Sequence, residues 1–86
     1  MFDPDRPWRL HSQVALREES FGALAYHYGN RRLVFLRSRT LVELVECLDR
    51  FDTASAAIDA TIEPAHKRSY QRALARLAAS EVIDVR

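Results

Sequence analysis

Hydrophobic and polar residues alternate with a period of two on both sides of Gly29 and Asn30. Before this pair, Leu24, Tyr26 and Tyr28 alternate with Ala23, Ala25 and His27, and after it Leu33 and Phe35 alternate with Val34 and Leu36. A period of two is typical of β-strands, because successive side chains of a strand point to opposite faces. Glycine and asparagine both tolerate positive φ, so the pair predicts a two-residue turn of the primed type. The stretch from Phe21 to Arg37 therefore predicts a β-hairpin.

A further strand is predicted upstream of the hairpin, over residues 13–18. Val14 and Leu16 lie on one face of it, and the polar residues 18–20 form the connection to the hairpin. Because an isolated hairpin is only marginally stable in water, a third strand and a covering layer are needed. We therefore expect a three-stranded antiparallel meander with one apolar face. Residues 1–7 contain two prolines and are expected to form a flexible lead-in.

Helical periodicity dominates the second half of the chain. Apolar positions three or four residues apart mark a first helix, at Leu41, Leu44, Val45, Leu48 and Phe51, and a third, at Tyr70, Ala73, Leu74, Leu77 and Ala78. Thr40 and Glu43 have the spacing of a capping box and are expected to start the first helix. A second, shorter helix is predicted over Ala54 to Thr61, with Asp52 or Thr53 as its cap.

The end of the chain completes the fold prediction. Pro64 suits the first position of the third helix, where its missing N–H costs no hydrogen bond. Residues 82–85 are expected to leave that helix as a short extended tail, packed on the core through Val82 or Ile83. Residues 1–86 are therefore expected to form a single α+β domain. Its three-stranded antiparallel sheet is followed by three helices, in an arrangement like that of a winged helix-turn-helix.

Charge and composition exclude several classes of protein. The chain has 86 residues, with 13 lysines and arginines against 12 aspartates and glutamates, so its net charge is only +1. A minimal DNA-binding domain is usually strongly basic, and this balance argues against a nucleic-acid partner. No apolar run approaches the ~20 residues of a membrane helix, and the single cysteine, Cys47, cannot form an internal disulfide. We therefore expect a cytoplasmic protein with no membrane partner.

Candidate catalytic residues are few. His11, His27 and His66 fall on three different predicted elements, without the spacing of a metal site, and His27 is expected on the open face of the sheet. Cys47 lies beside the apolar stripe of the first helix, where a cysteine is usually a small buried hydrophobe rather than a nucleophile. With only two glycines, the chain has no glycine-rich phosphate loop. The sequence therefore predicts neither an enzyme nor a cofactor or metal site.

A binding function requires fewer special residues. The strand at residues 32–37 is predicted to lie at a sheet edge, where unpaired N–H and C=O groups accept an additional strand. Arginines at both ends of that strand discourage self-pairing and attract an acidic peptide. If the third helix runs alongside, either Leu33 or Phe35 forms the floor of a groove. Tyr70 and Leu74 would wall it, unless these four side chains are simply core.

Two other functions stay open from the residues alone. The third helix carries several lysines and arginines on one face, and in a winged helix-turn-helix that element often enters the major groove of DNA. A winged-helix DNA-binding module is therefore the alternative to peptide binding. A small subunit that scaffolds an enzyme is a third possibility. Titration with an acidic peptide and with duplex DNA separates peptide binding from DNA binding.

The residues from Trp8 to Ile83 resemble a known family of proteins. The similarity is most specific in the segments VALREE and FGALAYHYGNRRLVFL and in the closing AL-RLA. The chain is similar to the MftB family of mycofactocin biosynthesis chaperones, a PqqD-like group related to the recognition elements of ribosomally synthesised, modified peptides. This resemblance implies a winged helix-turn-helix fold that binds a peptide in place of DNA.

The resemblance also implies a function and a site. A protein of this kind captures the leader of a ribosomally made precursor peptide, here expected to be acidic, and presents the peptide to a radical SAM maturase without itself being a catalyst. Relatives bind the leader as an added strand on the third strand of the sheet, over a groove shared with the third helix. By position, the implied peptide-binding residues are Arg32, Leu33, Val34, Phe35, Leu36 and Arg37 on the strand, and Lys67, Tyr70, Gln71 and Leu74 on the helix.

Overall fold

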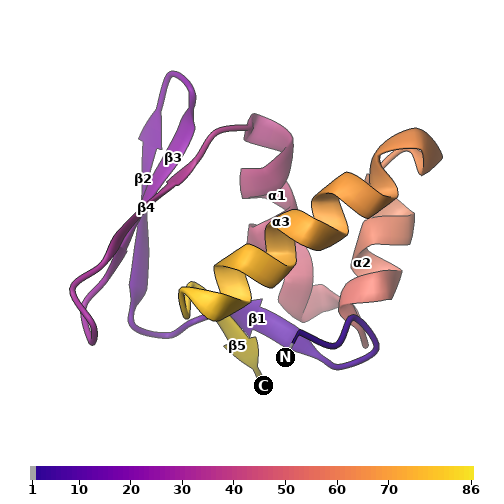
Figure 1. Cartoon of the computed structure of the whole chain (residues 1–86), viewed down its shortest axis with the longest axis horizontal. Coiled ribbons are helices and arrows are strands. Elements are labelled where there is room, and N and C mark those ends of the chain that lie inside the picture. Colours follow the sequence, from indigo (N-terminus) through magenta and orange to yellow (C-terminus); the bar gives the residue numbers. More distant parts are fainter. Residues whose placement is uncertain (1) are drawn as a thin grey trace.

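The computed structural model describes residues 2–86 and contains five strands and three helices. The strands are Trp8–Leu10 (β1), Val14–Glu19 (β2), Gly22–His27 (β3), Leu33–Leu36 (β4) and Ile83–Val85 (β5). The helices are Arg39–Cys47 (α1), Ala54–Thr61 (α2) and Lys67–Ala79 (α3), with 3-10 turns at Leu48–Arg50 (η1) and Pro64–His66 (η2). The fold class is therefore the predicted one, a three-stranded antiparallel sheet followed by three helices, with one small addition at the chain ends (Figure 1).

The main sheet has the strand order β2-β3-β4, and all of its pairs are antiparallel. Its three strands stand together on one side of the molecule, and the helices lie on the other side (Figure 1). The core between them includes the fully buried side chains of Leu36, Leu44, Leu48 and Leu74. The helices therefore cover one face of the sheet and leave its second face open.

The chain ends form a second, two-stranded sheet that the sequence did not reveal. β1 pairs antiparallel with β5, from Trp8 opposite Val85 to Leu10 opposite Ile83. The predicted extended tail is thus correct, and both Val82 and Ile83 are buried as expected. This pairing places the two ends of the described chain side by side (Figure 1). Residues 2–7 also contact the folded body, since the Ala54 and Ser55 N–H groups donate to the carbonyls of Arg6 and Pro4.

Helix α2 and the third helical segment begin where the sequence predicted, whereas α1 does not. Thr53 caps α2, because its hydroxyl oxygen accepts the Ala56 N–H, and Pro64 opens the 3-10 turn that leads into α3. The capping box predicted at Thr40 is wrong. Ser38 is the N-cap of α1, and its hydroxyl oxygen accepts the Leu41 N–H at 3.1 Å. The earlier start follows from Ser38, which has the extended backbone that a cap requires.

The loop between β3 and β4 is centred as predicted but is not a two-residue primed turn. The His27 N–H donates to the Arg32 carbonyl and the Arg31 N–H to the His27 carbonyl, so residues 28–31 form the loop. The positive φ of 63° falls on Arg31 rather than on Gly29 or Asn30. The physical reason is His27, whose Nδ1 accepts the N–H groups of both turn residues at 3.0 and 3.1 Å. These two hydrogen bonds favour the longer loop.

On the central strand β3, small residues face the helices and large ones face outward. Ala23, Ala25 and His27 are buried beneath the helices, whereas Tyr26 and Tyr28 are exposed. The expectation that His27 lies on the open face is therefore wrong, since only 4% of its surface is exposed. Helix α1 packs against β3, where alanine occupies the inner positions, and the same alternation turns Tyr26 outward.

Candidate functional site

Strand β4 leaves a row of backbone hydrogen-bonding groups unpaired. It is the last strand in the order β2-β3-β4, so within residues 2–86 only β3 pairs with it. The His27 N–H donates to the Arg32 carbonyl, and ladder bonds in antiparallel pairs alternate along the strand. The backbone groups of Val34 and Leu36 therefore point to β3. Those of Leu33 and Phe35 point away from the sheet, where another strand can bind them.

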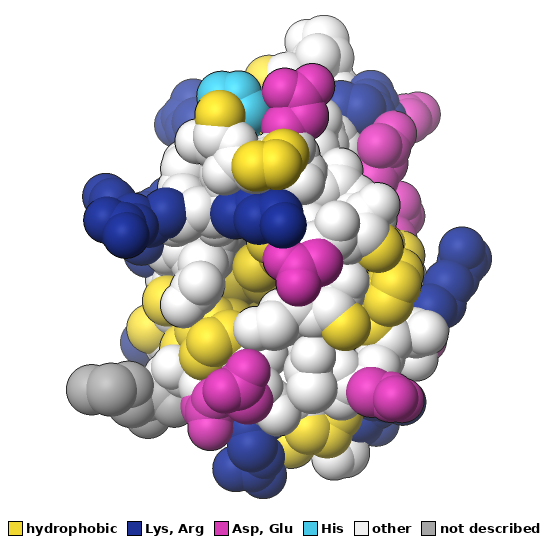
Figure 2. Space-filling model, turned by 90° about the vertical axis from the view of Figure 1, so that its right-hand side faces the viewer, with side chains coloured by type: hydrophobic (Ala, Val, Ile, Leu, Met, Phe, Trp, Pro, Cys, Tyr) yellow, Lys and Arg dark blue, Asp and Glu magenta, His cyan; other side chains and the backbone are white. Residues whose placement is uncertain are grey.

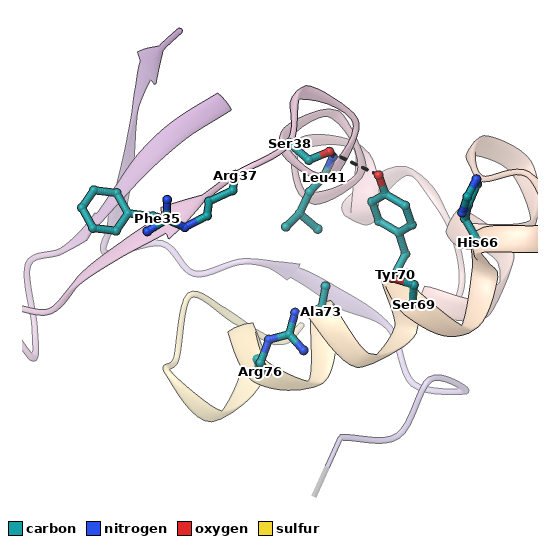
Figure 3. Close-up of a pocket in the computed structure, with 9 residues that line it drawn as sticks. All are labelled: Phe35, Arg37, Ser38, Leu41, His66, Ser69, Tyr70, Ala73 and Arg76. Carbon is teal, nitrogen blue, oxygen red and sulfur yellow. Dashed lines mark hydrogen bonds between the residues drawn. The ribbon is translucent and has the colours of Figure 1, made fainter. Parts of the chain in front are cut away.

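A groove of about 530 Å³ lies between this edge and helix α3. Figure 3 shows its two walls, with β4 and the strand-to-helix junction on one side and α3 on the other. The lining residues come from these two walls, from the first turn of α1 and from the end of η2. They are Phe35, Arg37, Ser38, Leu41, His66, Ser69, Tyr70, Ala73 and Arg76. An unpaired strand edge and a groove are thus side by side, which is the geometry for binding an extended chain.

A side-chain hydrogen bond joins the two walls. The hydroxyl groups of Ser38 and Tyr70 lie 3.2 Å apart, as the dashed line in Figure 3 shows. Ser38 is also the N-cap of α1, so the same residue fixes the start of that helix and holds α3 in place. This hydrogen bond ties α3 to the junction between β4 and α1. The fold itself, rather than a ligand, therefore holds the two walls of the groove together at this point.

The electrostatic character of the groove is positive. Arg37 and Arg76 line opposite walls, and neither forms an ion pair with another residue of the described chain. The Arg37 guanidinium lies over the Phe35 ring, 5.1 Å from its centroid, a distance typical of a cation–π contact. This contact holds the Arg37 guanidinium beside the Phe35 ring. An extended ligand that carries carboxylates therefore matches the charge of the groove.

The six residues predicted on the strand have different positions. The side chain of Leu36 is fully buried, and Val34 packs against the core, so only their backbone belongs to the strand edge. Leu33 and Phe35 are 60% and 55% exposed. Arg32 is exposed at the start of the strand, and Arg37 lies at its end. Phe35 and Arg37 are thus the predicted strand residues that line the groove, and the Phe35 ring itself points away from α3 (Figure 3).

The four residues predicted on α3 are less well grouped. Tyr70 lines the groove, but Leu74 is fully buried in the core. Lys67 pairs with Asp59 of α2 at 2.9 Å. Gln71 borders a different hollow, formed with Phe2, Arg68, Arg72 and Ala75.

The groove uses a neighbouring face of α3 that sequence reasoning missed. Beside the predicted Tyr70, its residues there are Ser69, Ala73 and Arg76, which follow helical spacing, and His66 of η2 adjoins them. The signal was present as the polar border of the apolar stripe that contains Tyr70 and Ala73. Which of the two borders faces β4 depends on how the helix is rotated on the sheet, and the periodicity does not contain that information.

Other chemistry has little support among residues 2–86. No three histidine, cysteine, aspartate or glutamate side chains in that range are close enough to hold a metal ion. Burial raises the pKa of the Cys47 thiol above its usual value, and its Sγ lies 3.4 Å from the Leu44 carbonyl oxygen. A thiol with a raised pKa is a poor nucleophile, because the thiolate is the reactive form. No helix of the described chain is both long and apolar enough to span a membrane.

The fold and the groove define a class of protein. This is a small α+β module with a free strand edge beside a basic groove, a surface suited to an extended, acidic peptide. The sequence model of the peptide chaperone MftB family matches residues 7–84. The chain belongs to this family, because the match covers most of its length and the curated relatives described next carry the same name.

Three curated relatives, each named as the peptide chaperone MftB, have 48% identity to this chain over 83 residues. They come from Mycobacterium ulcerans (strain Agy99), Mycobacterium tuberculosis (strain ATCC 25618 / H37Rv) and Mycolicibacterium smegmatis (strain ATCC 700084 / mc(2)155). In each case the aligned region covers 95% of this chain, and it covers 76%, 76% and 81% of the respective relative. No solved structure matches this chain.

Proposed function

We propose that this protein is a non-catalytic peptide chaperone of mycofactocin biosynthesis. It binds the leader of a ribosomally synthesised precursor peptide as an additional strand on β4 and presents the peptide to a radical SAM maturase in the cytoplasm. Family membership supports the chaperone role, since the relatives carry that name. The observation that carries the mode of binding is the free edge of β4 beside the groove.

Strand addition accounts for the placement of both backbone and side chains. The outward N–H and C=O groups of Leu33 and Phe35 supply hydrogen bonds that do not depend on the sequence of the leader. The groove then receives alternate side chains of the leader, which gives selectivity. Arg37 and Arg76 attract its carboxylates. We expect higher salt to slow association with an acidic leader, because screening weakens this attraction.

The proposed contacts are sufficient for useful affinity. Each new backbone hydrogen bond contributes about 0.5–1.5 kcal/mol net, and each apolar side chain buried in the groove about 1.5–3 kcal/mol. Ordering a flexible leader costs about 2–5 kcal/mol or more. The balance favours binding only if the leader uses both the edge and the groove. Removing either one is therefore expected to weaken the complex measurably.

The experiment compares Phe35→Pro with Phe35→Ala in titrations with the leader peptide. Both variants lose the aromatic ring, but only proline also removes the outward N–H and fills its place with a ring carbon. Proline is tolerated on an edge strand where the N–H faces away from the sheet. We expect Phe35→Pro to bind the leader about twofold to tenfold more weakly than Phe35→Ala does. This difference is the equivalent of one lost backbone hydrogen bond.

Val34→Pro is the matched control for the strand itself. The Val34 N–H points to β3, so this proline breaks the sheet, and we expect it to lower the thermal midpoint far more than Phe35→Pro does. Equal peptide affinity in Phe35→Pro and Phe35→Ala would rule out strand addition at this edge. Duplex DNA serves as the competing ligand for the winged-helix alternative. Binding of DNA in preference to the leader would replace the proposed function.

A further inference from the structure

The exposed large hydrophobic residues of the described chain gather on the outer face of the main sheet. The large hydrophobic residues that are exposed among residues 2–86 are Phe21, Tyr26, Tyr28, Leu33 and Phe35, with exposed fractions between 36% and 60%. All of them belong to the three-stranded sheet or its adjoining residues, and Leu24 lies among them on β3. Exposed apolar residues that gather on one face, rather than scatter singly, mark an interaction surface.

These side chains form an ordered surface. Leu24 pairs across the strands with Phe35, and Tyr26 with Leu33. The rings of Phe21 and Phe35 meet edge to face at 5.7 Å. All three helices lie on the opposite side of the sheet, and none of them covers this face (Figure 1). We call the surface formed by Phe21, Leu24, Tyr26, Tyr28, Leu33 and Phe35 the outer face.

The charges at the border of the outer face favour an acidic partner over a second copy of the chain. Arg31, Arg32 and Arg37 have no ion-pair partner within residues 2–86. The acidic residues of the same sheet are already neutralised, because Glu18 pairs with Arg39 and Glu19 with Arg17. Two outer faces placed together would therefore leave these three arginines without partners at the border of the contact.

The outer face is also continuous with the proposed peptide site. Strand β4 contributes Leu33 and Phe35 to the outer face, while its free edge and the groove lie to the other side. A molecule seated on the outer face lies next to a peptide on β4 and leaves the edge itself open. Because a peptide carrier must transfer its cargo to another protein, this neighbourhood favours a folded protein over a lipid surface.

We propose that the outer face is the docking surface for the maturase that receives the bound peptide. The complementary surface on that enzyme is apolar at its centre and carries carboxylates at its border, opposite Arg31, Arg32 and Arg37. This inference rests on the proposed function. It adds to it two adjacent surfaces that meet at Phe35 and Arg37: the β4 edge and groove hold the peptide, and the outer face holds the enzyme.

The test uses Leu24→Thr/Tyr26→Thr, two changes on the central strand that leave β4 unaltered. Threonine has a high strand propensity, so the sheet is retained while the centre of the outer face becomes polar. Binding of the radical SAM maturase and of the leader peptide are measured separately by calorimetry. We expect maturase affinity to fall at least about tenfold, as for a central interface residue, with leader affinity unchanged.

A charge variant and a matched control test the border. Arg31→Asn removes one unpaired cation, and asparagine tolerates the positive φ at this position. We expect slower association with the maturase at low salt. The control Arg68→Gln removes an exposed cation of α3 that lies at the hollow with Gln71, outside the outer face, and its association rate is expected to be unchanged.

The outcomes separate the two proposals. Unchanged maturase binding by Leu24→Thr/Tyr26→Thr overturns the docking surface and leaves peptide binding intact, whereas failure of the wild-type protein to bind the leader overturns the proposed function. A wild-type dimer that the variant converts to a monomer, or wild-type sedimentation with anionic phospholipid vesicles that the variant abolishes, also overturns the docking surface. If the variant does not fold, hydroxyl-radical footprinting of the wild-type protein decides: the maturase protects Tyr26 and Tyr28, or the proposal is wrong.

Discussion

The two faces of the main sheet have opposite distributions of side-chain size and exposure. On the inner face, Ala23 and Ala25 are each only 1% exposed and Leu36 is fully buried. On the outer face, the neighbouring residues of the same strands are aromatic or leucine and are largely exposed. In most two-layer folds the larger hydrophobic residues face the core. Here the central strand β3 turns its alanines to the core and its leucine and tyrosine outward, so folding alone does not account for the larger residues.

The helical side of the molecule has a different surface from the outer face. Figure 2 shows that side, where lysine, arginine, aspartate and glutamate side chains are interspersed and apolar atoms lie in small patches between them. A mixed surface of this kind is usual for a protein in water. The comparison indicates that the apolar outer face is a specific feature of the sheet, and substitutions that act on one face at a time can test it.

The largest expected effect separates Leu36 from Leu33, two leucines on the same strand. Leu36→Ala leaves a cavity in the core and is expected to lower the free energy of unfolding by about 2–5 kcal/mol. Leu33 is 60% exposed, and Leu33→Ala is expected to cost less than about 1 kcal/mol. Urea denaturation of both variants measures the difference. Similar losses would mean that the outer face is covered in solution, by a second copy or otherwise.

A second prediction adds volume instead of removing it. Ala25 lies on the inner face of the central strand, and Ala25→Leu is expected to destabilise the protein by about 1–3 kcal/mol, because the added atoms must displace the helices. Ala15 lies on the outer face of β2 and is half-buried, so Ala15→Leu is the control. We expect little change in its thermal midpoint. A tolerated Ala25→Leu would show that the helices do not pack closely on β3.

Much of the fold could be predicted because its signals are local. The strand alternation, the cap at Thr53 and the proline at position 64 each depend on residues within a few positions, and each was located from the sequence. The pairing of β1 with β5 joins residues more than seventy positions apart, and no local pattern encodes it. The loop at Gly29 was misassigned because the side chain of His27, rather than glycine chemistry, selects its conformation.

The candidate site was less predictable for two physical reasons. Alternation places Leu33 and Phe35 on one face of the strand, but it does not say which face the helices cover. Similarly, the stripe on α3 predicts that Tyr70 and Leu74 lie near the core, but not the rotation that directs Ser69 and Arg76 to the groove. Both missing quantities are orientations between elements. They follow from packing of the whole domain. Of the four residues predicted on α3, Tyr70, at the border of the stripe, is the one that lines the groove.

A third prediction concerns the polar residue on the inner face. His27 accepts two loop N–H groups through Nδ1, and its Nε2 is buried without a hydrogen-bond partner within residues 2–86. His27→Leu removes the acceptor for both N–H groups, at an expected cost of about 1–3 kcal/mol. Hydrogen exchange should accelerate at Gly29 and Asn30 in particular. The neighbouring Tyr28→Leu, on an exposed residue, serves as the control, and unchanged exchange in His27→Leu would show that the loop does not depend on this side chain.

The smallest expected effect concerns the polar pair on the outer face. Arg17 Nε lies 2.6 Å from Glu19 Oε2, but the Arg17 side chain is 77% exposed, so water and salt screen the attraction. A double-mutant cycle with Arg17→Gln and Glu19→Gln is expected to give a coupling energy of about 0.2–1 kcal/mol that falls as salt is raised. A coupling above about 2 kcal/mol that is insensitive to salt would mean that this pair is shielded from water, and hence that something covers the outer face in the free protein. A weak, salt-sensitive coupling is what an open docking surface requires, because the pair can then be separated at little cost when carboxylates of a partner approach Arg17.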